Sequence, residues 1–148
     1  MFYNILVTLD GSELAETVIP YVEGLATRFP TRKVVLLRVV PPPHYFFEGS
    51  FYALGETQEQ MEAIAQEYLD KIASRLQAKG LPVEIELRRG EVASEIIDYA
   101  HEHGIDLLAM STHGRSGVKR WVFGSVAEKV LRSLNLPILL IRPEEVQI

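Results

Sequence analysis

Short apolar runs alternate with longer amphipathic stretches from one end of this chain to the other. Strands that alternate with helices in this way form a mostly parallel sheet with helices on both of its faces. We therefore expect an α/β protein with one doubly wound, mostly parallel sheet of five strands, in a single domain that spans residues 1–148. The five runs lie at 4–9, 33–40, 83–88, 107–111 and 138–141.

The amphipathic stretches predict the helices between these strands. Apolar residues at helical spacing begin near Ser12, but Pro20 removes one backbone hydrogen bond and predicts a kink or a late helix start. A second stripe runs over 61–76 and stops at Gly80, where glycine suits a left-handed cap. Further helices are expected over 93–100, ending at Gly104, and after Ser125.

The segment 41–57 has no convincing period and is unusually aromatic. Loops of this length are often functional. Its rings either cover the sheet or a subunit contact, or form a lid over a bound base; the sequence leaves both open.

Composition excludes several functions. The chain has no cysteine, which rules out disulfides, thiol catalysis and zinc–thiolate sites and fits a reducing compartment. A net charge of −5 argues against nucleic acid as a partner, because such binding needs a basic surface. The chain shows neither an apolar run of membrane length nor a basic start with a signal-peptide core, so we expect a cytoplasmic protein without a membrane partner.

Two strand ends carry the residues most suited to binding, because ligands of such sheets lie beyond the carboxyl ends of the strands. One is the turn 10–12 (Asp-Gly-Ser), and the other is the stretch 110–125. Glycines in that stretch allow close approach to a phosphate, and the helix after it offers free N–H groups. Between Ser111 and Ser125 it has no acidic residue and three basic ones, Arg115, Lys119 and Arg120. This local positive charge favours binding of a polyphosphate.

Taken singly, these residues also fit plain structural roles. Ser125 could be a helix N-cap that follows Gly124, and Asp10 could form an Asx turn. Their joint spacing carries more weight. Residues 111–141 closely resemble the C-terminal signature of the universal stress protein family, and residues 5–12 resemble its first strand and turn. The resemblance in length and element order covers the whole chain, with strand order 3-2-1-4-5.

Nucleotide-binding members of that family carry the pattern G-x2-G-x9-G-[ST]. This chain reads Ser111-x2-Gly114-x9-Gly124-Ser125, so serine replaces the first glycine. The resemblance implies that Gly114, Gly124 and Ser125 hold phosphates, that Asp10 holds the ribose, that Val39 and Met110 form the adenine walls, and that His113 and Val126 lie beside them.

Other sites match less well. No P-loop and no dinucleotide fingerprint follows a strand. The serines near His113 lack a nucleophile elbow and an evident orienting carboxylate, so we expect no catalytic residue. His101 and His103 point to different faces of a helix, and we expect no metal site in the protein.

The resemblance thus implies a stress-response sensor that binds ATP or AMP, with Mg²⁺ arriving on the phosphates, rather than a fast enzyme. We expect it to act through a protein partner, not specified by the sequence, and through a homodimer formed by the apolar fifth strand, Ile138 to Ile141, at the sheet edge. A ligand-free interaction protein of the same fold and a slow ATPase or self-phosphorylating protein remain the alternatives.

Overall fold

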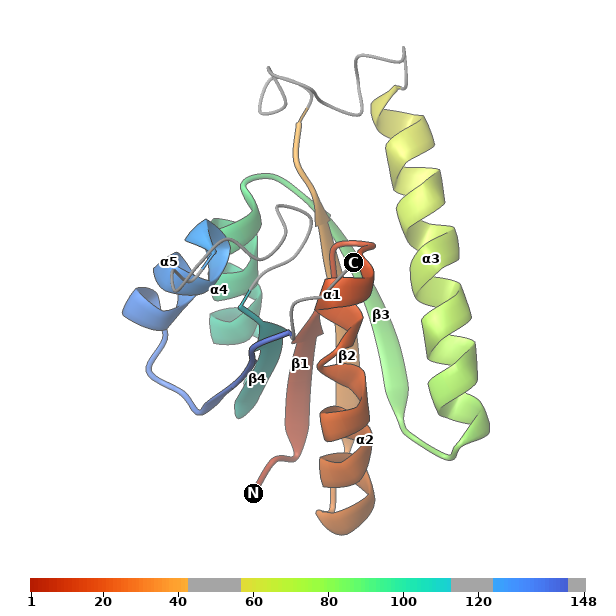
Figure 1. The fold of residues 1–148 in the computed structure, drawn as a ribbon, viewed down its shortest axis with the longest axis vertical. Helices are drawn as coiled ribbons and strands as arrows, with labels where there is room; N and C mark the ends of the chain where they lie inside the picture. The colour runs from red at the N-terminus through yellow and green to blue at the C-terminus, as the bar shows by residue number, and fades with distance from the viewer. Residues whose placement is uncertain (43–56, 113–123, 144–148) are drawn as a thin grey trace.

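The computed structural model describes residues 1–42, 57–112 and 124–143. Its five strands form one parallel sheet in the order β3-β2-β1-β4-β5, which confirms the predicted fold (Figure 1). The strands are β1 (Asn4–Thr8), β2 (Lys33–Val40), β3 (Val83–Arg89), β4 (Leu107–Ser111) and β5 (Ile138–Ile141). The helices are α1 (Glu13–Glu16), α2 (Ile19–Arg28), α3 (Gln58–Ala78), α4 (Val92–Glu102) and α5 (Ser125–Ser133).

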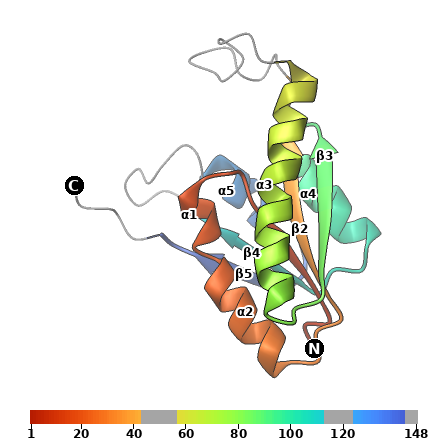
Figure 2. The ribbon, with the colours of Figure 1, turned by 90° about the vertical axis from the view of Figure 1, so that its right-hand side faces the viewer.

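The helices cover the sheet from both sides. Figures 1 and 2 show α1, α2 and α3 on one face and α4 and α5 on the other. Each face buries its own apolar cluster: Val34 and Leu36 of β2 pack with the first three helices, whereas Val35, Leu37 and Val39 pack with α4 and α5. Because β2 is buried on both faces, nearly every residue of this strand is apolar.

The predicted interruption near Pro20 divides the first helical stretch into two helices. Ser12 caps α1, since its hydroxyl accepts a hydrogen bond from the Ala15 N–H at 3.2 Å. Pro20 lies in the first turn of α2, where a missing N–H costs no intrahelical bond. The helical stretch is therefore interrupted: α1 begins directly after Ser12, and α2 begins beside Pro20.

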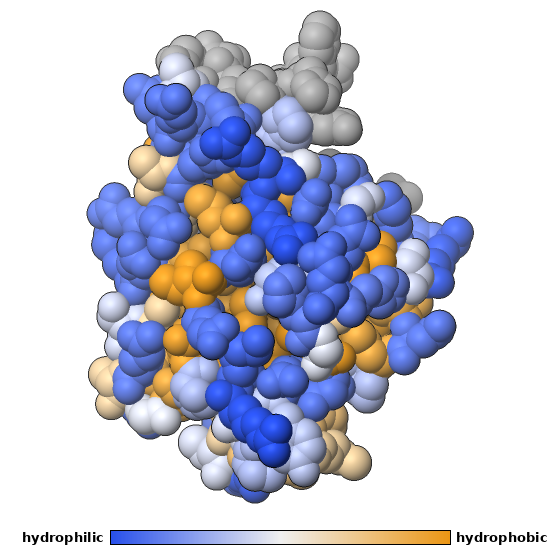
Figure 3. Space-filling view, turned by 180° about the vertical axis from the view of Figure 1, so that it is seen from behind, coloured by the Kyte–Doolittle hydropathy of each residue, from blue (hydrophilic) through white to orange (hydrophobic). Residues whose placement is uncertain are grey.

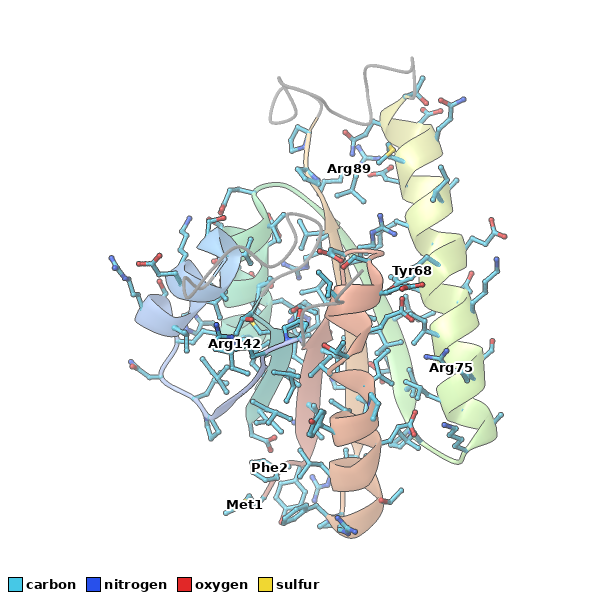
Figure 4. All side chains as sticks on the ribbon, viewed as in Figure 1. Met1, Phe2, Tyr68, Arg75, Arg89 and Arg142 are labelled. Atoms are coloured by element: carbon cyan, nitrogen blue, oxygen red, sulfur yellow. The ribbon has the colours of Figure 1, made fainter. Side chains whose placement is uncertain are left out.

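Hydrogen bonds within the chain close the amino end of the sheet, where β1 begins. The Asp106 carboxylate accepts hydrogen bonds from the N–H groups of Tyr3, at 2.8 Å, and Asn4, at 3.1 Å. Phe2, labelled at this end in Figure 4, packs edge-to-face on Phe29 with ring centroids 5.1 Å apart. This end is thus tied to the loop before β4.

Over the described residues, no helix has both the length and the apolarity needed to cross a membrane. On the face shown in Figure 3, the hydrophobic residues form separate patches among hydrophilic side chains.

Candidate functional site

A cavity of about 290 Å³ opens at the carboxyl ends of β1, β2 and β4. This is where the chain changes its winding direction, since β1 pairs with β2 on one side and with β4 on the other. Parallel sheets place their ligands at such a point. The cavity is lined by Thr8, Leu9, Asp10, Ala15, Leu37, Arg38, Val39, Val40, Pro41, Met61, Val92, Ile96, Met110, Ser111, Thr112, Gly124, Ser125, Val126 and Ala127.

Part of the wall is apolar. Val39 of β2 and Met110 of β4 belong to the apolar cluster beneath α4 and α5, together with Ile96 and Ala127 of those helices. These four side chains are almost fully buried in the chain alone. A flat, weakly polar ring placed against them would remove further apolar surface from water.

The wall also has a polar part, which comes from three chain segments. Ser111 is the last residue of β4 and Thr112 follows it, and both are buried. Gly124 is the N-cap of α5 and Ser125 is its first residue. The Gly124 N–H donates to the Thr112 carbonyl at 2.9 Å, which fixes the start of α5 against the end of β4. The hydroxyls and the helix start therefore face one cavity, together with Asp10.

Asp10 is oriented by its own turn. Its Oδ1 atom accepts hydrogen bonds from the N–H of Ser12, at 2.9 Å, and from the Ser12 hydroxyl, at 2.5 Å. This is the Asx turn that the sequence suggested. Gly11 between them has φ +89°, a left-handed conformation that favours glycine. The turn thus sets the direction of a carboxylate at the cavity wall.

The N-terminus of α5 differs from the suggested serine cap. Gly124 is the N-cap and Ser125 is the first helical residue, so the idea that Ser125 caps this helix is wrong. Among the described residues, no side chain caps α5. The N–H groups of its first turn therefore keep the partial positive charge of a helix start, at a place where Gly124 to Ala127 all line the cavity.

A second helix start borders the cavity at Val92, the first residue of α4. Glu91 caps this helix by accepting a hydrogen bond from the Ser94 N–H at 2.8 Å, and Lys129 of α5 donates to the same carboxylate at 3.1 Å. Partial burial works to raise the pKa of Glu91, but the hydrogen bonds from Ser94 and Lys129 outweigh it and hold that pKa below its usual value. The ion pair links α4 to α5 beside the cavity.

The structure gathers most of the residues singled out by the sequence. Asp10, Val39, Met110, Ser111, Gly124, Ser125 and Val126 all line the cavity. His113 and Gly114 lie outside the described residues, as do Arg115, Lys119, Arg120 and most of the aromatic segment 41–57. Within the described ranges, no three His, Cys, Asp or Glu side chains cluster as metal ligands would.

Sequence reasoning missed several wall residues. Ala15, Met61 and Ile96 resemble ordinary core residues of their helices, and no pattern in the sequence separates cavity wall from core. Arg38 did leave a signal, because it is a lone charge inside the apolar run of β2.

Comparison with known proteins gives a consistent result. A family model described as the universal stress protein family matches residues 1–142. A putative universal stress protein of Staphylococcus aureus is 31% identical over 150 residues, which cover 97% of this chain and 86% of that protein. The solved structure of the protein MJ0577 of Methanocaldococcus jannaschii superposes with a TM-score of 0.85 at 26% identity, over 99% of both chains.

Two more distant structures share the fold and hold ligands. A universal stress protein in complex with cAMP has a TM-score of 0.66 at 20% identity, over 97% of this chain and 98% of its own. A universal stress protein family protein of Arabidopsis thaliana with AMP bound has a TM-score of 0.65 at 13% identity, over 95% and 92%.

Proposed function

This chain belongs to the universal stress protein family, and we propose that it is a sensor that binds an adenine nucleotide, ATP or AMP, in the cavity at the carboxyl ends of β1, β2 and β4. The observation that carries the proposal is the cavity itself. Seven residues that the resemblance to this family implies for nucleotide binding, scattered from Asp10 to Val126 in the sequence, line this one space.

Each part of the wall suits one part of a nucleotide. Val39 and Met110 offer apolar contact to the adenine ring. The Asp10 carboxylate accepts hydrogen bonds from the ribose hydroxyls, each worth about 1.5–3 kcal/mol for a charged acceptor. Gly124 and Ser125 bring the first-turn N–H groups of α5 to the phosphates, as helix starts do for anions.

Two of the compared structures support an adenine nucleotide as the ligand, since one protein was solved with cAMP and another with AMP. Ser111 stands where the family pattern has its first glycine, and serine is among the smallest side chains that can replace it. Mg²⁺ arrives with the phosphates and keeps most of its water ligands. His113 and Gly114 complete the phosphate end in this proposal.

The wall favours binding over fast catalysis. Among the described residues that line the cavity, Asp10 is the one carboxylate, and its Oδ1 atom is held by Ser12. A carboxylate oriented in this way suits a hydroxyl partner better than the activation of a water. We propose a cytoplasmic binding protein that signals through a protein partner, with slow ATP hydrolysis as a side activity at most.

We also propose a homodimer through β5. This strand lies at the edge of the sheet, and all four of its residues, Ile138 to Ile141, are apolar yet only half-buried in the single chain. An edge strand of this kind invites pairing with a second chain. Light scattering over micromolar concentrations should give twice the monomer mass, and a monomer mass throughout would reject the dimer.

Two measurements test the proposed nucleotide binding: the nucleotide that copurifies with the protein, and the affinity of nucleotide-free protein for added nucleotides. Freshly purified protein is heat-denatured and the released small molecules are separated; we expect an adenine nucleotide. Nucleotide-free protein is then titrated with ATP, AMP and cAMP by calorimetry, with GTP as the control for base selectivity. No released nucleotide and no binding at millimolar concentrations would favour the ligand-free interaction protein instead.

A further inference from the structure

A charged side chain is buried inside the central strand β2. Arg38 is only 5% exposed, between the apolar neighbours Leu37 and Val39. Burying a guanidinium is costly unless other groups compensate its charge. A hydrophobic residue would fit this position of the strand, so the role of the arginine must lie in its contacts with other elements.

The surroundings of Arg38 supply that explanation. Leu37 and Val39 face α4 and α5, so Arg38 projects to the opposite face, toward α1 and α3. Its guanidinium carbon lies 5.2 Å from the centre of the Tyr68 ring on α3. The guanidinium also meets the turn after β1: a Cβ atom on Gly11 would lie 3.0 Å from Nη1 and 3.2 Å from Cζ. The backbone of Gly11 therefore rests directly on the guanidinium.

Two carboxylates belong to the same cluster. Burial raises the pKa of Tyr68 above its usual value, Glu16 and Asp10 raise it further, and Arg38 acts in the opposite direction. Figure 4 shows Tyr68 on the side of α3 that faces α1. Asp10, Glu16, Arg38 and Tyr68 thus form one cluster under the turn 10–12, made from that turn, α1, β2 and α3.

We propose that Arg38 is a positioning residue for Asp10, which supports the turn 10–12 from beneath and so sets how strongly the cavity selects a nucleotide with ribose hydroxyls. This inference rests on the proposed nucleotide binding. The planar guanidinium packs against Gly11, and it places a positive charge near the carboxylates of Asp10 and Glu16. Lysine offers a point charge without the plane, so it replaces arginine only in part.

The test compares two ligands that differ only in the sugar, AMP and 2′,3′-dideoxy-AMP. The wild type should bind AMP at least about 10-fold more tightly, as expected for hydrogen bonds to a charged acceptor. Arg38→Met keeps the length of the apolar stem and removes the charge. It should lower the affinity for AMP by about 10-fold and leave that for dideoxy-AMP unchanged, because only the sugar contact depends on Asp10.

Two further variants make the result specific. Arg75→Met removes an exposed arginine of the same helix layer, on α3, and should change neither affinity. In Asp10→Asn, the additional change Arg38→Met should have little further effect on AMP binding, because the two residues act through one contact.

The outcomes separate this inference from the proposed function. A wild type that binds neither ligand overturns the proposed function and the inference with it. A wild type that binds AMP, with an Arg38→Met variant that loses both ligands equally or neither, overturns the inference alone. If Arg38→Met does not fold, Arg38→Lys is used instead. It should lose some affinity for AMP, though less than expected for Arg38→Met, and keep its affinity for dideoxy-AMP. Equal losses of affinity for the two ligands, or no loss for either, would overturn the inference.

Discussion

The two ends of the same sheet are built differently. At the amino end, Asp106 accepts two backbone N–H groups, and Phe2 packs on Phe29, so side chains of this protein complete the local hydrogen bonds and contacts. At the carboxyl end, hydroxyls, a carboxylate and an uncapped helix start surround a cavity of about 290 Å³.

This difference separates stability from binding. Contacts that are complete within the chain contribute to the free energy of unfolding whether or not a ligand is present. Groups that surround a cavity contribute mainly when something fills it, since a ligand stabilises the native state only by binding to it. Substitutions at the amino end should therefore change stability, and those of residues that line the cavity at the carboxyl end should change affinity.

Gly124→Val tests the carboxyl end and should have the largest effect. Its backbone angles, φ −59° and ψ 155°, are open to valine, so the fold should survive. The added side chain at the cavity wall keeps phosphate away from the first-turn N–H groups of α5. We expect AMP and ATP affinity to fall more than about 100-fold, the scale of two charge-assisted hydrogen bonds, measured by calorimetry.

Circular dichroism of the Gly124→Val variant provides the control, since a native spectrum must accompany the loss of affinity. A folded variant that binds nucleotides as the wild type does would remove Gly124 from the binding site. It would also remove the contrast between the two ends.

Much of the fold could be predicted from the sequence because it depends on periodicity. The predicted runs 33–40, 107–111 and 138–141 coincide with β2, β4 and β5. Glycines marked two helix ends for a physical reason, since Gly80 and Gly104 both have positive φ angles. The position of Pro20 predicted an interruption, although only the structure shows two separate helices.

The site was only partly predictable. Asp10, Gly124 and Ser125 stand out because a strand end or a helix start limits which residues fit there. Ala15 and Ile96 do not, because a residue that lines a cavity and one that fills a core obey the same hydrophobic pattern. Arg38 was overlooked since β2 was read as an apolar strand, and its partners on α1 and α3 are distant in sequence.

Asp106→Ala tests the amino end. It removes a charged acceptor from the N–H groups of Tyr3 and Asn4, and we expect the free energy of unfolding to fall by about 1–3 kcal/mol. Urea denaturation measures the loss, and AMP affinity should stay the same. Asp106→Asn keeps one side-chain oxygen and should lose less. A drop in affinity comparable to that of a cavity variant would show that the two ends are not independent.

The substitution Gly24→Ala changes a residue outside both ends of the sheet and should make the protein more stable. Gly24 is in the interior of α2, and a Cβ atom there would meet nothing within 4 Å. Alanine should therefore stabilise the protein by about 0.5–1 kcal/mol by restricting the unfolded chain, with unchanged nucleotide affinity. Thermal unfolding checks the gain, and this variant is also the matched glycine control for Gly124→Val. A loss of stability would mean that α2 needs a flexible residue at this position.

The smallest effect concerns a capped helix start at the carboxyl end. Glu91 caps α4 and pairs with Lys129, and its pKa in the folded protein lies below the ordinary value of 4.5. Because the folded pKa is the lower one, its charge stabilises the fold at pH values above the unfolded pKa, and this contribution disappears as pH falls through the folded pKa. The side chain is 40% exposed, so solvent limits the effect to about 0.2–1 kcal/mol.

Glu91→Gln isolates this contribution, since every other acid titrates alike in the two proteins. Urea denaturation should find the variant less stable at pH 7, and the difference should disappear as the pH falls through the folded pKa of Glu91, because the wild-type carboxyl is then protonated and uncharged. Added salt should shrink the difference at pH 7, because it screens the pair with Lys129. A difference that stayed unchanged down to the lowest pH at which the protein remains folded would mean that Glu91 acts through shape or neutral hydrogen bonding. In that case α4 and α5 would be joined beside the cavity by packing and neutral hydrogen bonds, and only the cavity wall itself would distinguish the carboxyl end from the amino end.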